Sequence, residues 1–141
     1  MNEFEVEELI ISILMSSVLL GGEEAFLEGE VYKNGTRSEI RNEDVIVEVL
    51  SIDDEQFQNA IVSVRTYVDD LNIGSPKLVP NTSRLKEIAD KYEELFKTKN
   101  SSYALTTNKF RMKLDSIKRE RKADIGQHCV NCLFNLVIIN V

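Results

Sequence analysis

Hydrophobic and polar positions follow two different periods along the chain, and each period predicts a different kind of element. Between residues 84 and 96, apolar side chains recur every three or four positions, which predicts an amphipathic helix. Asn81 or Thr82 would cap this helix by accepting hydrogen bonds from its free backbone N–H groups. A first helix is predicted from about Glu3, apolar and buried on much of its circumference. Gly21-Gly22 is expected to end it, because glycine readily adopts positive φ.

Five segments predict β-strands, because they are apolar at every second position or along a short run. They are residues 30–32, 44–50, 56–68, 110–115 and 128–139. Segment 56–68 has an apolar and a polar face, which is typical of an antiparallel sheet covered on one side. It should form a hairpin with the strand before it. Residues 117–126 predict a basic hairpin tip, and residues 69–81 predict the longest loop.

The predicted order is helix, three strands, helix, two strands, in a single domain that spans residues 1–141. Two amphipathic helices on one face of an antiparallel sheet of four to five strands give a two-layer α+β sandwich. A chain of this size buries about two-thirds of its unfolded surface, so it needs no disulfide or metal to fold.

Charge is distributed unevenly along the chain. Residues 1–76 carry 17 acidic and 4 basic side chains, whereas residues 77–141 carry 7 acidic and 13 basic, for a net charge of −7. One interpretation is that acidic and basic elements lie side by side in one sheet. The other is a dipolar surface that docks copies head to tail, because complementary potentials fix the register of a contact. The net negative charge disfavours binding to phosphate backbones, so we expect no sequence-specific nucleic-acid binding.

The apolar run from Leu9 to Leu20 has the length of an export-signal core. Four glutamates among the first eight residues argue against that function, since export signals begin with positive charge. Twelve residues are also too few to span a bilayer. We therefore expect a cytoplasmic protein with no membrane partner, in which the cysteines stay reduced.

Cys129-Val130-Asn131-Cys132 has the spacing of a redox motif or of half a zinc site. Zinc needs four ligands, and the chain has two cysteines and one histidine. Because residues 128–139 predict a strand, thiols three positions apart should point to opposite faces of the sheet. The sequence therefore predicts two buried free cysteines, with no metal site and no cofactor.

His128 is the natural candidate for a general base, but no GxSxG or HExxH motif accompanies it. We expect a structural histidine and a protein that is not an enzyme. A small hydrolase or transferase would need His128 in a cleft beside a carboxylate, with a shifted titration. A ligand-binding or regulatory module, the main alternative, would need a deep closed apolar pocket between the sheet and the helices.

Two acidic clusters, Asp53-Asp54-Glu55 and Asp69-Asp70, lie in predicted loops and lack the ligand spacing of a calcium loop. The basic tip lacks the aromatic side chains that stack on nucleic-acid bases. Contact residues favour loops held on a rigid scaffold. We therefore predict a subunit interface at these five acidic residues and at the four basic residues of the tip, Lys118, Arg119, Arg121 and Lys122.

The element order and three short phrases resemble small tail-completion and head–tail joining proteins of tailed phages, the tail terminator-like proteins. The phrases are Gly29-Glu30-Val31-Tyr32-Lys33, Val64-Arg65-Thr66-Tyr67-Val68 and Val79-Pro80-Asn81-Thr82-Ser83-Arg84-Leu85. The resemblance covers nearly the whole chain. It implies a sheet flanked by helices and a non-enzymatic ring of identical subunits that caps the tail tube or joins it to the neck. Other tail or neck proteins would be the partners, and the source would be a phage or a prophage.

Overall fold

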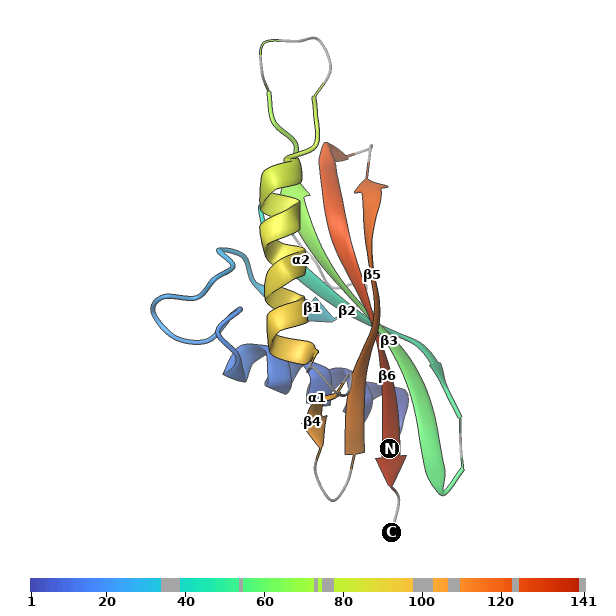
Figure 1. Cartoon of the computed structure of the whole chain (residues 1–141). Coiled ribbons are helices and arrows are strands. Elements are labelled where there is room, and N and C mark those ends of the chain that lie inside the picture. Colours follow the sequence, from blue (N-terminus) through green and yellow to red (C-terminus); the bar gives the residue numbers. More distant parts are fainter. Residues whose placement is uncertain are drawn as a thin grey trace.

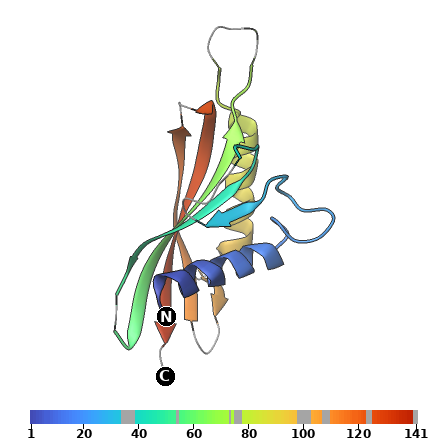
Figure 2. The ribbon, with the colours of Figure 1, turned by 180° about the vertical axis from the view of Figure 1, so that it is seen from behind.

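The computed structural model describes residues 1–33, 39–53, 55–72, 74, 78–97, 103–106, 110–122 and 125–139, with the backbone alone for 103–106 and 122. The elements follow in the order α1 (Glu3–Ser16), β1 (Val31–Lys33), β2 (Val45–Ile52), β3 (Phe57–Asp69), α2 (Thr82–Phe96), β4 (Tyr103–Thr106), β5 (Phe110–Lys122) and β6 (Gln127–Ile139). Both helices lie on the same side of a twisted sheet (Figure 1, Figure 2), which confirms the predicted α+β class. Within these ranges, no helix is both long and apolar enough to cross a bilayer.

The six strands form one sheet in the order β1-β2-β3-β6-β5-β4. All neighbours pair antiparallel except β1 and β2, which are parallel, so the sheet is mixed. The sequence did not predict β4, which pairs with the first residues of β5. A strand of four residues is too short for alternation to reveal it, and the pattern at residues 30–32 gave no sign that β1 pairs parallel to β2.

Helix α1 begins with a capping box and ends earlier than predicted. Asn2 Oδ1 accepts a hydrogen bond from the Glu5 N–H at 2.9 Å, and Glu5 accepts one from the Asn2 N–H at 3.3 Å. The helix ends at Ser16 rather than at Gly21-Gly22. The hydroxyl of Ser17 donates to the Leu14 carbonyl at 2.7 Å and so competes with the next backbone hydrogen bond.

One face of α1 packs against the sheet, and the other does not. Val6, Ile10 and Leu14 are fully buried, whereas Phe4 is 69% exposed and Met15 is 51% exposed. The sequence predicted burial around much of this helix, because most of its positions are apolar. The fold of one chain therefore leaves apolar surface on α1 facing outward.

Helix α2 matches its prediction closely. Asn81 is the N-cap, and its Oδ1 accepts from the Arg84 N–H at 3.3 Å. The apolar stripe is buried against the sheet at Leu85, Ile88, Tyr92 and Phe96. Opposite it, the long strands β3 and β6 pair from Phe57↔Ile139 to Asp69↔Gln127, and every second side chain joins the core.

A β-bulge at Asp115 changes which residues of β5 face the helices. Up to Leu114, the even-numbered residues face the helices. Beyond the bulge the odd-numbered residues face them, because Ile117 now pairs with Cys132 on the helix side. The strand then continues to Lys122, because β6 offers a continuous ladder of partners. The prediction of a hairpin tip over residues 117–126 was therefore wrong for residues 117–122.

Candidate functional site

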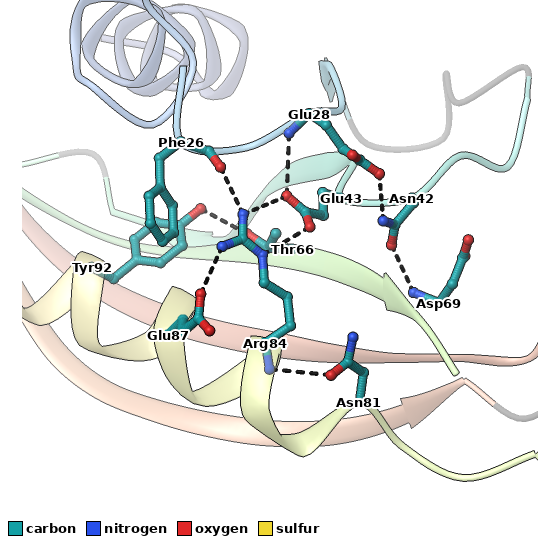
Figure 3. A network of polar contacts seen from close by, with 10 residues as sticks. All are labelled: Phe26, Glu28, Asn42, Glu43, Thr66, Asp69, Asn81, Arg84, Glu87 and Tyr92. Carbon is teal, nitrogen blue, oxygen red and sulfur yellow. Dashed lines mark hydrogen bonds and ion pairs between the residues drawn. The ribbon is translucent and has the colours of Figure 1, made fainter. Parts of the chain in front are cut away.

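Arg84, in the first turn of α2, joins segments that are far apart in the sequence (Figure 3). Its guanidinium donates to both carboxylate oxygens of Glu43, at 2.9 and 2.8 Å, and to the Phe26 carbonyl at 2.7 Å. It also donates to Glu87 at 3.0 Å. The hydrogen bonds to Glu43 raise the pKa of Arg84 above its ordinary value. Because the Glu43 side chain is 7% exposed, this bidentate pair lies largely out of water.

The backbone around Glu43 is shaped to present its carboxylate. Glu43 has a φ of 62°, in the left-handed region, and its carboxylate also accepts from the Glu28 N–H at 3.2 Å. Gly29 lies against the Glu43 carbonyl so closely that a Cβ there would collide with it. Two of the phrases that carry the family resemblance, residues 29–33 and 79–85, therefore meet at this joint. Its polar groups satisfy one another, so it positions the helix and offers no group for chemistry.

A second polar cluster lies on the sheet face that the helices leave open. Arg65 Nη1 lies 2.9 Å from Glu48, and its Nε lies 3.2 Å from Glu120, which also accepts from Asn131 at 3.1 Å. Burial raises the pKa of Glu120, but the hydrogen bonds from Asn131 and Arg65 outweigh it, and the pKa is lowered. These charges line a cavity of about 370 Å³, in which one guanidinium contacts two carboxylates.

The two thiols point to opposite faces of β6, which confirms the sequence prediction. Cys129 Sγ lies 3.8 Å from Glu120 on the open face, and Cys132 lies on the helix side, near Tyr92. Burial raises the pKa of the Cys129 thiol to about 12 and raises that of Cys132 as well. In the part of the chain that the structure describes, no three His, Cys, Asp or Glu side chains gather as metal ligands would.

His128 lies beside a carboxylate, as an enzyme would require. Its Nδ1 is 2.6 Å from Asp70 Oδ1, and both side chains are largely buried. Neither residue lines the cavities of the helix side, the open face or the α1 side. The pair ties the end of β3 to the start of β6, which is a structural contribution.

The acidic residues predicted for an interface lie at two ends of the sheet. Asp53 closes the β2–β3 turn, and the hydrogen bond that it accepts from the Asn59 N–H at 2.9 Å lowers its pKa. Glu55 follows in the same turn, and Asp54 lies outside the described residues. Asp69 ends β3 at the other extreme, roughly 40 Å away along a strand of 13 residues. Asp69 accepts a hydrogen bond from Gln127 at 2.7 Å, and Asp70 contacts His128. Both carboxylates therefore already have partners within the chain.

The basic residues predicted for an interface come together on the edge of the sheet. Lys118, Arg119 and Arg121 lie in the second half of β5 and are exposed, and Lys122 is the last residue of that strand. The register places Arg121 beside His128. They lie in a strand, not at the hairpin tip that the sequence predicted.

Strand order turns the uneven charge of the sequence into a separation in space. Helix α1 packs on β1 and β2 at one edge of the sheet, whereas β5 lies toward the other edge. Residues 1–33 hold eight glutamates and one lysine, and residues 110–122 hold six basic and two acidic side chains. The acidic segment 1–33 and the basic segment 110–122 are therefore on opposite sides of β3 and β6, although the two halves of the chain meet where β3 pairs with β6.

Sequence reasoning did not single out Glu43 or the outward face of α1. Glu43 is 41 positions from Arg84, and no local pattern pairs them. The excess of apolar residues in α1 could have indicated its exposed apolar face, since a helix that packs on one sheet face needs only a single apolar stripe.

Comparison with known proteins identifies no family: no family model matches this chain, and no curated protein is significantly similar to it.

Proposed function

We propose that this chain is a structural assembly protein of a phage or prophage tail or neck. Copies form a ring that caps the tail tube or joins it to the neck. The observation that carries this proposal is the separation of acidic and basic elements to opposite edges of one sheet. A contact between unlike edges is heterologous, and it closes into a ring when the rotation per copy divides a full turn.

The state of the polar groups supports a function at the surface. Among the described residues, every buried side-chain nitrogen or oxygen has a hydrogen-bond partner. The Arg84–Glu43 joint and the Arg65 cluster are satisfied within the chain, so neither leaves a group poised for a substrate. The surface groups that the fold does not use are the exposed apolar side chains on α1 and the cations Lys118 and Arg119 on β5, which have no acidic partner among the described residues.

The partners in this proposal are further copies of the chain and other tail or neck proteins. The net charge of −7 would make the ring repel DNA phosphates, so that a passing duplex slides through it without sequence-specific binding. Assembly would take place in the host cytoplasm, and the ring would become part of the virion.

The test is the mass of the purified full chain in solution, measured by sedimentation velocity and by native mass spectrometry. We expect a discrete oligomer in 50 mM salt that dissociates in 500 mM salt, because salt screens charges across an exposed contact. Negative-stain images should show closed rings. A protein that stays monomeric at high concentration in low salt would refute the proposal.

The alternative is a cytoplasmic ligand-binding or regulatory module without catalysis. The cavity of about 330 Å³ between α2 and β5 is within the size range of ligand pockets, which favours it. This cavity opens at the surface, whereas Tyr92 and Phe134 fill the space between helix and sheet. A monomer whose melting temperature rises with a small apolar anion would support this alternative.

A further inference from the structure

We infer that the contact between copies seats the outward face of α1 of one copy in the groove between α2 and β5 of the next. This inference rests on the proposed self-assembly and names the two surfaces that perform it. The surfaces are complementary in apolar content and in charge, and one chain carries both.

The groove has an apolar floor and a basic rim. It encloses about 330 Å³, with Leu85 and Ala89 of α2 facing Ile117 and Val130 of the sheet across its floor. Ala89 and Ile117 are half-buried, so apolar surface is accessible inside it. The cationic side chains at its rim are Lys86 and Arg119, whereas Lys118 lines it between them but pairs with Asn131, so its side chain points to the open face of the sheet.

The groove is open because the sheet ends beside it. β4 pairs with β5 only as far as Lys113, and in the described chain no strand borders β5 beyond that point on the side away from β6. Lys118 and Arg119 are exposed, and neither has an acidic partner among the residues that the structure describes. An acidic partner seated in the groove would therefore find the charge of Arg119 unpaired.

The outward face of α1 carries apolar and acidic side chains that would complement the apolar floor and basic rim of the groove. Phe4, Glu8 and Met15 are exposed and lie along one stripe of the helix, and Ile11 between them is half-buried against the core. Phe4 is the most exposed of the large apolar side chains in the described ranges, and aromatic side chains seated in pockets commonly dominate the energy of an interface. Glu8 contacts Lys33 at 3.5 Å, but both side chains are about half exposed, so this pair is weak.

Charge and topology together select the occupant. Two α1 faces would bring glutamates together, and two grooves would bring cations together, so like surfaces repel each other. A chain cannot fill its own groove, because α1 is anchored on β1 and β2 and the strands β3 and β6 separate it from β5. The remaining occupant is the α1 of a second copy, whose own groove stays open for a third.

Two variants each disable one of these surfaces. Phe4→Ser removes the anchor of α1, and Ala89→Arg fills the groove with a long side chain. Each variant alone should be monomeric and keep the circular dichroism spectrum of the wild type. An equimolar mixture should form a dimer of twice the 16.1 kDa chain mass and nothing larger, because one intact contact remains.

Matched controls test whether the effect is local. Phe57→Ser changes another exposed phenylalanine, on β3, and should leave the oligomer unchanged. Arg119→Glu at the rim should weaken assembly at least tenfold, whereas Lys113→Glu on the same strand, which points to the open face, should not. A control that disrupts assembly as strongly as its partner variant would overturn the assignment of the surfaces.

The outcomes separate this inference from the proposed function. A wild-type protein that forms no oligomer refutes both. A wild-type oligomer that survives Phe4→Ser and Ala89→Arg refutes the assigned surfaces and leaves the assembly function standing. A mixture of the two variants that forms no dimer, or forms larger species, also refutes the surfaces.

Discussion

Replacing Arg84 by methionine should destabilise the fold strongly. The change keeps much of the side-chain volume but removes the bidentate hydrogen bonds to Glu43 and the bond to the Phe26 carbonyl. It leaves the Glu43 carboxylate in a largely buried position with the Glu28 N–H at 3.2 Å as a remaining donor. Removing one partner of a buried ion pair costs about 3–5 kcal/mol, because the other charge is left uncompensated.

The exposure of the two side chains places the expected loss in unfolding free energy for Arg84→Met at the lower end of that range. The Arg84 side chain is 22% exposed and that of Glu43 is 7% exposed, so water screens part of the interaction. We therefore expect a loss of about 3 kcal/mol in the free energy of unfolding. With a urea m-value of about 2 kcal/mol/M, the midpoint should fall by about 1.5 M.

Urea unfolding followed by circular dichroism at 222 nm measures this change. Lys86→Met is the matched control, because Lys86 pairs with Asp90 on the exposed face of the same helix and should lose less than about 0.5 kcal/mol. The double variant Arg84→Met/Glu43→Gln should regain part of the loss, since the stranded charge is then gone. The reasoning would be refuted if Arg84→Met and Lys86→Met lowered the urea midpoint equally. It would also be refuted if the loss in the double variant equalled the sum of the losses in Arg84→Met and Glu43→Gln.

Two further predictions concern titration and thiol chemistry. Because the pKa of Glu120 is lowered from 4.5 in the folded state, its stabilising effect is present above that value and is lost as pH falls through the lowered pKa. The gap in urea midpoint between wild type and Glu120→Gln should therefore be constant from pH 8 to pH 5 and close below, and a gap that does not change with pH would contradict this. Burial raises the pKa of Cys129 to about 12, so about one thiol in ten thousand is a thiolate at pH 8. Ellman's reagent should react with both cysteines only after unfolding in urea, and fast reaction of the folded protein would show that the thiols are accessible.

Regular periodicity explains what the sequence could predict. The three-to-four spacing from Leu85 to Phe96 fixed the buried face of α2, and Asn81 marked its first turn. The alternation after Gln127 likewise implied that Cys129 and Cys132 point to opposite faces, as they do. Both predictions use local rules, in which side-chain direction depends on position within one element.

Features that depend on distant residues or on a local irregularity escaped prediction. The bulge at Asp115 shifts the alternation of β5 by one residue, so the basic segment after it resembled a loop. The pairing of Glu43 with Arg84 depends on how β2 and α2 pack, which no local pattern encodes. The residues that we predict for a subunit interface were expected in loops, whereas Lys118 and Arg119 belong to a strand.

The bulge at Asp115 also affects how the molecule behaves at high concentration. An extra residue bends an edge strand and increases its twist, and lysine and arginine side chains along the edge discourage a further strand from pairing there. Open edges of this kind are otherwise templates for sheet growth and amyloid-like fibres. The irregularity that sets the direction of the basic side chains therefore also guards this protein against aggregation, while leaving its side chains available for reversible contacts.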